Sequence, residues 1–107
     1  MNKVLQALFN EMQRIKAEVP DSRWFLFGSS TATKRPARDI DLLVVCKNAF
    51  DCVIIRRELD SICMQFPIHL MIMTESEESE LTFIKGQKAT EMASSTALAQ
   101  KTSYYRD

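Results

Sequence analysis

The sequence predicts a small α/β (α+β) domain, in which a mixed β-sheet is flanked by helices. Helical and strand patterns alternate along the chain, and the strand-like runs are short and apolar at almost every position. Such runs are typical of strands that are covered on both faces by packed helices. At 107 residues, the chain is expected to fold as one domain.

Composition narrows the class of protein. Lys+Arg and Asp+Glu number 14 each, so the formal net charge is zero, which argues against broad electrostatic binding to nucleic acid or acidic membranes. No apolar run approaches the ~20 residues of a membrane helix, and residues 1–19 do not have the pattern of a signal peptide. The three cysteines lack the close spacing of a metal site, so we expect free thiols in a cytoplasmic protein.

The first elements follow from apolar spacing and from residues that break secondary structure. Helical spacing predicts an amphipathic helix over residues 2–18. Residues 24–27 read as a short buried strand, which Gly28 ends. Residues 39–45 are the next strand, and their apolar second half predicts a central place in the sheet. Asn48 can then cap a helix that runs to about residue 64.

The last elements are a third strand over residues 68–73 and a helix after it. Thr74, with Glu77 three residues later, is a capping-box pattern that opens this helix, which is expected to reach about Lys85. The domain therefore spans residues 1–86. The tail over residues 87–107 is rich in Ser, Thr and Ala, and is expected to be either weakly helical or disordered.

Two predictions concern packing. The helix between the second and third strands has a suitable length for a parallel crossover, whereas the first two strands are compatible with an antiparallel pair. Phe50 and Val53 contribute to a rough apolar stripe on that helix, and Met64, Met71 and Met73 are expected in the core.

Two aspartates lie at the start of the predicted second strand, which is otherwise apolar. Asp39 and Asp41 point to the same face, roughly 6.5–7 Å apart along the chain. Two carboxylates on one face repel each other, and Mg²⁺ (or Mn²⁺) bound between or beside them would remove that penalty. The simpler alternative is that the carboxylates lie in solvent or pair with Arg38 and Lys34.

The turn after the first strand offers groups that suit phosphate. Gly28 allows close approach of the backbone to a ligand, and Ser29 and Ser30 supply hydroxyl and N–H donors. In an antiparallel pair, this turn and Asp39/Asp41 meet at one edge of the sheet, an arrangement suited to phosphoryl or nucleotidyl transfer. The alternative is an ordinary turn that ends a strand.

These residues resemble a known family. FLFGSS, then a gap of nine residues after Ser29, then DIDLLV, is similar to the signature of the minimal nucleotidyltransferases in the DNA polymerase β superfamily. The resemblance covers residues 24–45 closely and extends over residues 1–85. It implies the nucleotidyltransferase fold, ATP as the nucleotide, and Mg²⁺ held by Asp39 and Asp41. The reaction implied is transfer of a nucleotidyl group to an acceptor hydroxyl, and AMP is the group expected.

The family pattern carries a third acid on the following strand, where this chain has Ile68-His69-Leu70. A parallel crossover would place His69 beside Asp39 and Asp41. His69 is either a drifted, partly buried residue or a working metal ligand or general base. Lys34, Arg35 and Arg38 lie between the Gly28 turn and Asp39, and they either contact the triphosphate or belong to a solvated loop.

The resemblance also implies the kinds of partner. Minimal members of the family often act beside a separately encoded helical protein, many of them as antitoxins that modify or mask a HEPN-type toxin. A homodimer is a further option, and no membrane partner is expected. The alternative to an enzyme is a catalytically impaired module that binds a nucleotide or a partner protein, because His69 replaces an acid.

Overall fold

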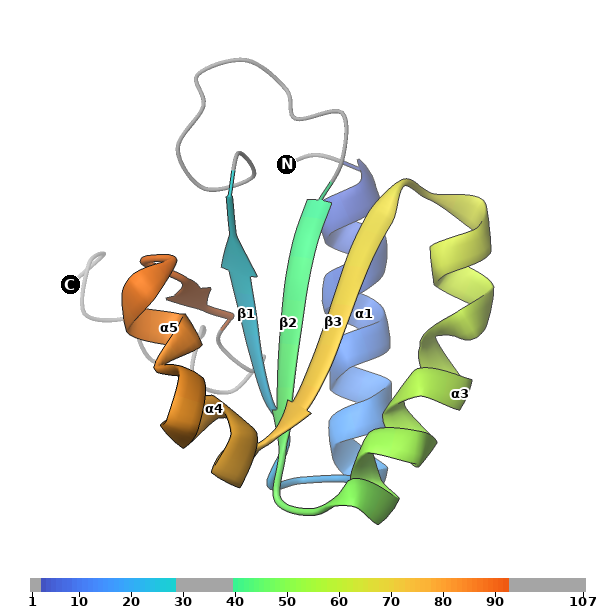
Figure 1. Ribbon diagram of the computed structural model, residues 1–107. Helices are drawn as coiled ribbons and strands as arrows, with labels where there is room; N and C mark the ends of the chain where they lie inside the picture. The colour runs from blue at the N-terminus through green and yellow to red at the C-terminus, as the bar shows by residue number, and fades with distance from the viewer. Residues whose placement is uncertain (1–2, 29–39, 93–107) are drawn as a thin grey trace, which may run out of the picture.

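The protein is described here by a computed structural model, which covers residues 3–28 and 40–92. It has a four-stranded mixed sheet flanked by helices, so the predicted α/β class is confirmed (Figure 1). In chain order the elements are α1 (Lys3–Glu18), β1 (Arg23–Phe27), β2 (Ile40–Cys46), α3 (Ala49–Gln65), β3 (Ile68–Thr74), α4 (Glu75–Leu81), α5 (Phe83–Gly86) and β4 (Thr90–Glu91).

The sheet has the strand order β3-β2-β1-β4. β1 and β2 pair in antiparallel fashion, whereas β2 and β3 are parallel and are joined through α3, as the sequence predicted. The register places Asp41 of β2 opposite Phe27 on one side and opposite His69 on the other. One row across the sheet therefore contains these three residues.

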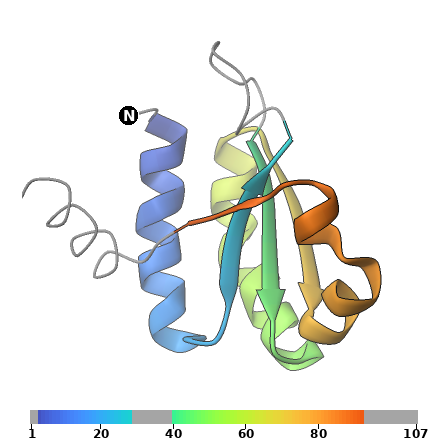
Figure 2. The ribbon, with the colours of Figure 1, turned by 90° about the vertical axis from the view of Figure 1, so that its left-hand side faces the viewer.

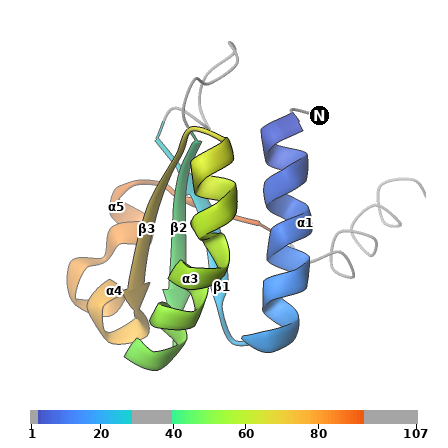
Figure 3. The ribbon, with the colours of Figure 1, turned by 90° about the vertical axis from the view of Figure 1, so that its right-hand side faces the viewer.

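Helices cover both faces of the sheet. α1 and α3 lie on one face, and α4 and α5 lie on the other (Figures 2 and 3). Leu42 and Val44 belong to the apolar cluster beneath α1 and α3, while Leu43 and Val45 belong to the second cluster, which includes Phe83 of α5. All four β2 residues are at most 4% exposed. The prediction of a central strand buried on both faces is confirmed.

A chain of buried hydrogen bonds joins the end of α1 to the start of β1. The Ser22 hydroxyl donates to the Val19 carbonyl at 2.8 Å and accepts from the Trp24 indole N–H at 2.9 Å. Ser22 is 1% exposed and Trp24 is fully buried. A buried Trp needs a partner for its N–H, and this serine supplies one while it fixes the turn.

The predicted helix starts are confirmed. The Asn48 side chain accepts a hydrogen bond from the Asp51 N–H at 2.9 Å, and Thr74 and Glu77 form the reciprocal bonds of a capping box. The helix expected to reach Lys85 is instead divided, because Thr82 adopts φ +46° between α4 and α5. Within the described residues, no helix is long and apolar enough to cross a membrane.

A short strand, β4, was not predicted. It forms the edge of the sheet beside β1, on the side away from β3. It is antiparallel to β1, and the Arg23 guanidinium donates two hydrogen bonds to the Glu91 carboxylate, at 3.0 and 2.8 Å. Two residues carry too little pattern to signal a strand, so only this long-range pairing identifies it. The rest of the predicted tail, residues 93–107, lies outside the described residues.

The packing of α3 differs from the sequence prediction. Its buried residues are Ile55, Leu59 and Ile62, whereas Phe50, Val53 and Met64 are 73%, 63% and 80% exposed. Of the two methionines on β3, Met73 is buried and Met71 is 40% exposed. The prediction of core packing is therefore wrong for Met64 and Met71. α3 covers the sheet with one face only, and β3 is an edge strand.

The three cysteines are free, as predicted, and Cys46 is fully buried. Burial raises the pKa of the Cys46 thiol to about 12, and the pKa of Cys52, which shares a hydrogen bond with it, is also raised by burial. The same cause raises the pKa of Cys63. Thiols of raised pKa carry little thiolate, so these residues behave as small apolar side chains.

We predict that Ser22→Ala lowers the free energy of unfolding by about 1–3 kcal/mol, because the indole N–H of Trp24 would be buried without an acceptor. Urea denaturation followed by tryptophan fluorescence measures the change. Ser61→Ala is the matched control, since the Ser61 hydroxyl accepts an exposed side-chain bond, and its effect should stay within about 0.5 kcal/mol. Equal effects of the two substitutions would contradict the prediction.

Candidate functional site

The candidate site lies where β1 ends and where β2 and β3 begin, at the upper end of the sheet in Figure 1. Antiparallel pairing of β1 and β2, with parallel pairing of β2 and β3, brings these three strand ends together. The sequence predicted this meeting, and it is confirmed for Gly28, Asp41 and His69. These residues are far apart along the chain, so it is the pairing of the three strands that brings them together.

Asp41 is the one charged residue of β2. Because alternate residues of a strand share a face, its carboxylate lies on the face of Leu43 and Val45, beneath α4 and α5. The side chain is 21% exposed, so it retains contact with water while its backbone continues a buried strand. The position at the end of the strand explains how an apolar segment accepts a charge.

His69 lies beside Asp41, with its Nδ1 atom 3.3 Å from the Asp41 Oδ1 atom. The predicted neighbourhood of these two residues is therefore confirmed. The imidazole is 76% exposed, so the expectation of a partly buried histidine is wrong. An exposed imidazole beside a carboxylate is accessible to a ligand. Its role as metal ligand or base stays a prediction.

Gly28 is constrained by Asp41 as well as by its own backbone. Its φ is +65°, a left-handed conformation that side chains disfavour. A Cβ atom at this position would also collide with the Asp41 Oδ2 atom and would lie 3.2 Å from Cγ. The sequence pointed to Gly28 for close approach to phosphate, but it carried no sign of this second reason, which depends on the register of β1 and β2.

An aromatic pair stands on the same face of the sheet. Phe27, the β1 partner of Asp41, contacts Phe83 of α5 edge-to-face, with ring centroids 5.0 Å apart and planes at 89°. Phe27 belongs to the same row of the sheet as Asp41 and His69, and Phe83 packs against it. Sequence reasoning did not assign them to the site, because the placement of α5 over the sheet is a tertiary feature.

Several predicted site residues lie outside the described part of the chain. They are Asp39, which was predicted to bind the metal, Ser29 and Ser30, which were predicted to bind phosphate, and the basic residues Lys34, Arg35 and Arg38. Their predicted roles are neither supported nor opposed by the geometry above. The site that can be described consists of Gly28, Asp41 and His69.

The described residues fit a divalent cation in part. Mg²⁺ takes one or two carboxylates and completes its coordination with water and phosphate oxygens, which a partly exposed Asp41 allows. His69 would add a nitrogen donor, which suits Mn²⁺ better than Mg²⁺. Within residues 3–28 and 40–92, no group of three or more Asp, Glu, His or Cys side chains is placed to hold a metal ion.

We predict that Gly28→Ala destabilises the fold by at least ~1–2 kcal/mol, because an alanine at φ +65° is strained and its Cβ meets the Asp41 carboxylate. The control is Gly86→Ala, where a Cβ meets nothing within 4 Å, and no loss of stability is expected. Thermal and urea unfolding measure both.

A double substitution separates the two causes. Asp41→Ala removes the carboxylate but leaves the backbone strain, so Gly28→Ala should cost less in that background than in the wild type. Equal costs in the two backgrounds would show that the carboxylate does not restrict Gly28.

Comparison with known proteins assigns neither a family nor a function to this chain. The chain matches no protein-family model, no curated protein and no solved structure. The resemblance to minimal nucleotidyltransferases therefore stays a prediction from the sequence.

Proposed function

We propose that this protein is a nucleotidyltransferase that binds ATP with Mg²⁺ and transfers AMP to a hydroxyl group of an acceptor. One observation carries the proposal: a glycine at the end of β1 borders the carboxylate of Asp41, which in turn lies 3.3 Å from the His69 imidazole. A glycine turn that could bind phosphate, beside an acid at the ends of neighbouring strands, would supply the groups that such a transfer requires.

In this proposal Gly28 keeps the space beside Asp41 free of a side chain. The backbone after it, with Ser29 and Ser30, would bind the phosphates of ATP. Asp41 and Asp39 would bind the divalent cation, which supplies charge neutralisation at the phosphates when it is bound. Lys34 and Arg38 would contact the triphosphate. The acceptor oxygen forms a bond to the α-phosphorus, the bond to pyrophosphate breaks, and pyrophosphate leaves.

The hydroxyl of the acceptor must lose a proton during this transfer. His69 is the described group best suited to accept it, because imidazole is a frequent general base and this side chain is 76% exposed. The Asp41 carboxylate lies beside Nδ1 of the His69 ring, so Nε2 is the nitrogen that would accept the proton from the acceptor hydroxyl. An acceptor hydroxyl on a separate protein is the simplest choice, because the described domain is filled by its own core.

A second candidate function is a binding module without turnover. The observation that favours it is His69, since the resembled family carries an acid there and imidazole is a poor ligand for Mg²⁺. Such a module would hold a nucleotide, or a partner protein, at the same strand ends. Nucleotide binding without release of pyrophosphate distinguishes it from the enzyme.

We predict that ATP with Mg²⁺ raises the free energy of unfolding of the wild type by about 2.7 kcal/mol at 100 times its dissociation constant. Asp41→Asn should remove most of this gain, because it removes a charge that the cation would balance. Thermal unfolding with and without EDTA measures it. Asp21→Asn is the control: Asp21 lies ahead of β1, at the other end of that strand, and pairs with exposed Lys47.

The same titration has two outcomes that oppose the assignment. If Asp41→Asn and the wild type respond alike, Asp41 is not part of the metal–nucleotide site. If Asp21→Asn loses the response as well, the loss comes from altered stability or net charge.

Substitution of His69 is predicted to separate its two roles. As a general base, its loss in His69→Ala should slow transfer of label from ATP roughly 10²–10⁴-fold while leaving nucleotide binding. As a drifted residue at an acid position, His69→Asp should instead raise the Mg²⁺-dependent rate. The measurement is release of pyrophosphate together with labelling of the acceptor. Unchanged rates in both variants would exclude His69 from the chemistry.

A further inference from the structure

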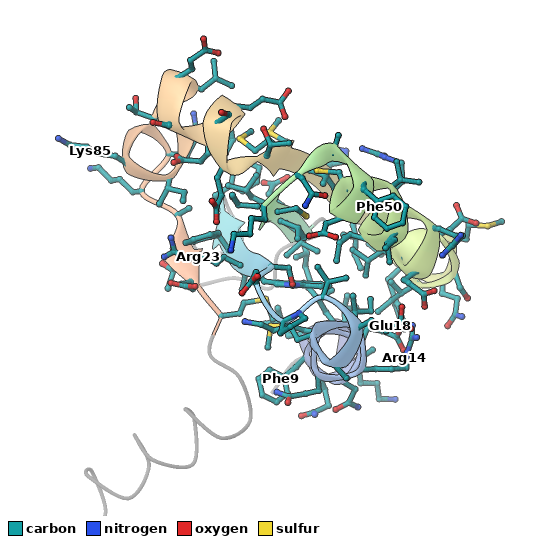
Figure 4. All side chains as sticks on the ribbon, turned by 90° about the horizontal axis from the view of Figure 1, so that it is seen from below. Phe9, Arg14, Glu18, Arg23, Phe50 and Lys85 are labelled. Carbon is teal, nitrogen blue, oxygen red and sulfur yellow. The ribbon has the colours of Figure 1, made fainter. Side chains whose placement is uncertain are left out.

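The outward face of α3 is apolar although it is exposed. Among the described residues, five large hydrophobic residues are at least 40% exposed, and three of them lie on this one helix: Phe50, Val53 and Met64. α3 lies beside α1 on one face of the sheet (Figure 3), and Phe50 lies near the start of α3 (Figure 4). Apolar groups of this size gathered on one exposed element are typical of an interaction surface.

The exposed residues follow a regular spacing. Steps of three, four, three and four residues connect five exposed positions, which form one stripe along the helix. The stripe lies opposite the buried positions Ile55, Leu59 and Ile62. We call it the α3 seam, and its members in order are Phe50, Val53, Arg57, Asp60 and Met64.

The two charged residues in the middle of the α3 seam form no ion pair within the described part of the chain. Neither Arg57 nor Asp60 forms an ion pair within 4 Å there, although other charges of the helix layer do: Glu58 pairs with Arg14 of α1 at 2.8 Å. The seam thus has apolar ends and a centre with one positive and one negative group.

We propose that the α3 seam binds the same seam of a second copy of this chain, with the two helices antiparallel about a two-fold axis. In this arrangement Arg57 faces the partner's Asp60, and Val53 faces the partner's Met64. Each contact occurs twice by symmetry. Both pairings are favourable in one register, so the surface is complementary to itself, as a two-fold interface requires. A second copy is therefore the occupant that this charge pattern selects.

A hollow beside the seam gives the partner's side chain a place. It has a volume of about 440 Å³, and Val53, Arg57 and Asp60 contribute to its lining together with Ile72 of β3. The partner's Met64, opposite Val53, is long and unbranched, and methionine adapts to irregular apolar spaces. Its exposure of 80% in the single chain is relieved when it enters this hollow.

Sedimentation of the full chain over a concentration series tests the proposal. The wild type should reach twice the 12.3 kDa mass of one chain. Met64→Lys should raise the dissociation constant of the dimer at least about tenfold, because apolar burial is lost. The matched control is Leu81→Lys, at an exposed apolar position on α4 outside the seam, which should dimerise as the wild type does.

Charge reversal tests the register and does not depend on the apolar ends. Arg57→Glu would face the partner's Asp60 with a like charge, and Asp60→Lys would face the partner's Arg57 likewise, so each should weaken the dimer about tenfold or more. The double variant Arg57→Glu/Asp60→Lys restores opposite charges and should restore the dimer. Circular dichroism verifies that each variant is folded.

Three results would overturn the proposal. The first is a wild type that stays at the mass of one chain throughout the series, which would leave the seam to a different protein or to none. The second is a dimer that Met64→Lys does not weaken, which would place the interface elsewhere. The third is a double variant as weak as the single variants, which would exclude the antiparallel register. None of these measurements involves ATP, so they are independent of the proposed transfer activity.

Discussion

The burial of β2 on both faces is the constraint on which the rest of the fold depends. Leu42, Leu43 and Val44 are fully buried, so the strand cannot tolerate an open face on either side. α1 and α3 cover one face, and α4 and α5 cover the other. Flanking strands must also satisfy the backbone groups of β2, which β1 and β3 do on its two sides. The parallel course of β3 arises because α3 returns the chain to the end of the sheet where β2 begins.

The same constraint concentrates polar chemistry at one end of the sheet. A buried strand accepts a carboxylate only where water or a partner reaches it, and Asp41, one residue after the start of β2, meets that condition. Its neighbours are then determined by pairing. β3 contributes His69 in the same row, and β1 contributes Gly28, whose lack of a side chain leaves room for the carboxylate. A glycine whose position suits a ligand is thus also required by the protein itself.

The strand ends with Asp41 and His69 and the α3 seam lie on different parts of the molecule. The first offers polar groups, whereas the second offers exposed apolar side chains. The strand ends supply polar groups with partial access to water, and the proposed ATP site rests on these groups. The α3 seam supplies a continuous stripe with apolar ends, which suits contact with another helix. α3 connects the two regions: its inner face positions β3, and hence His69, while its outer face is left exposed.

The sequence by itself determined the first two helices, the start of the third, three strands, their order and the pairing that brings Gly28, Asp41 and His69 together. Two-sided apolar runs, capping residues such as Asn48, and a crossover helix are local signals with few alternative outcomes. The tertiary structure decided what depends on contacts between distant segments. β4 forms only because Thr90 and Glu91 meet β1, α4 and α5 separate at Thr82, and Phe50 and Met64 stay exposed because one face of α3 suffices to cover the sheet. The sequence does not tell whether a given apolar side chain is buried or exposed, because apolar residues occur in both places. Only the packing of the folded chain decides it.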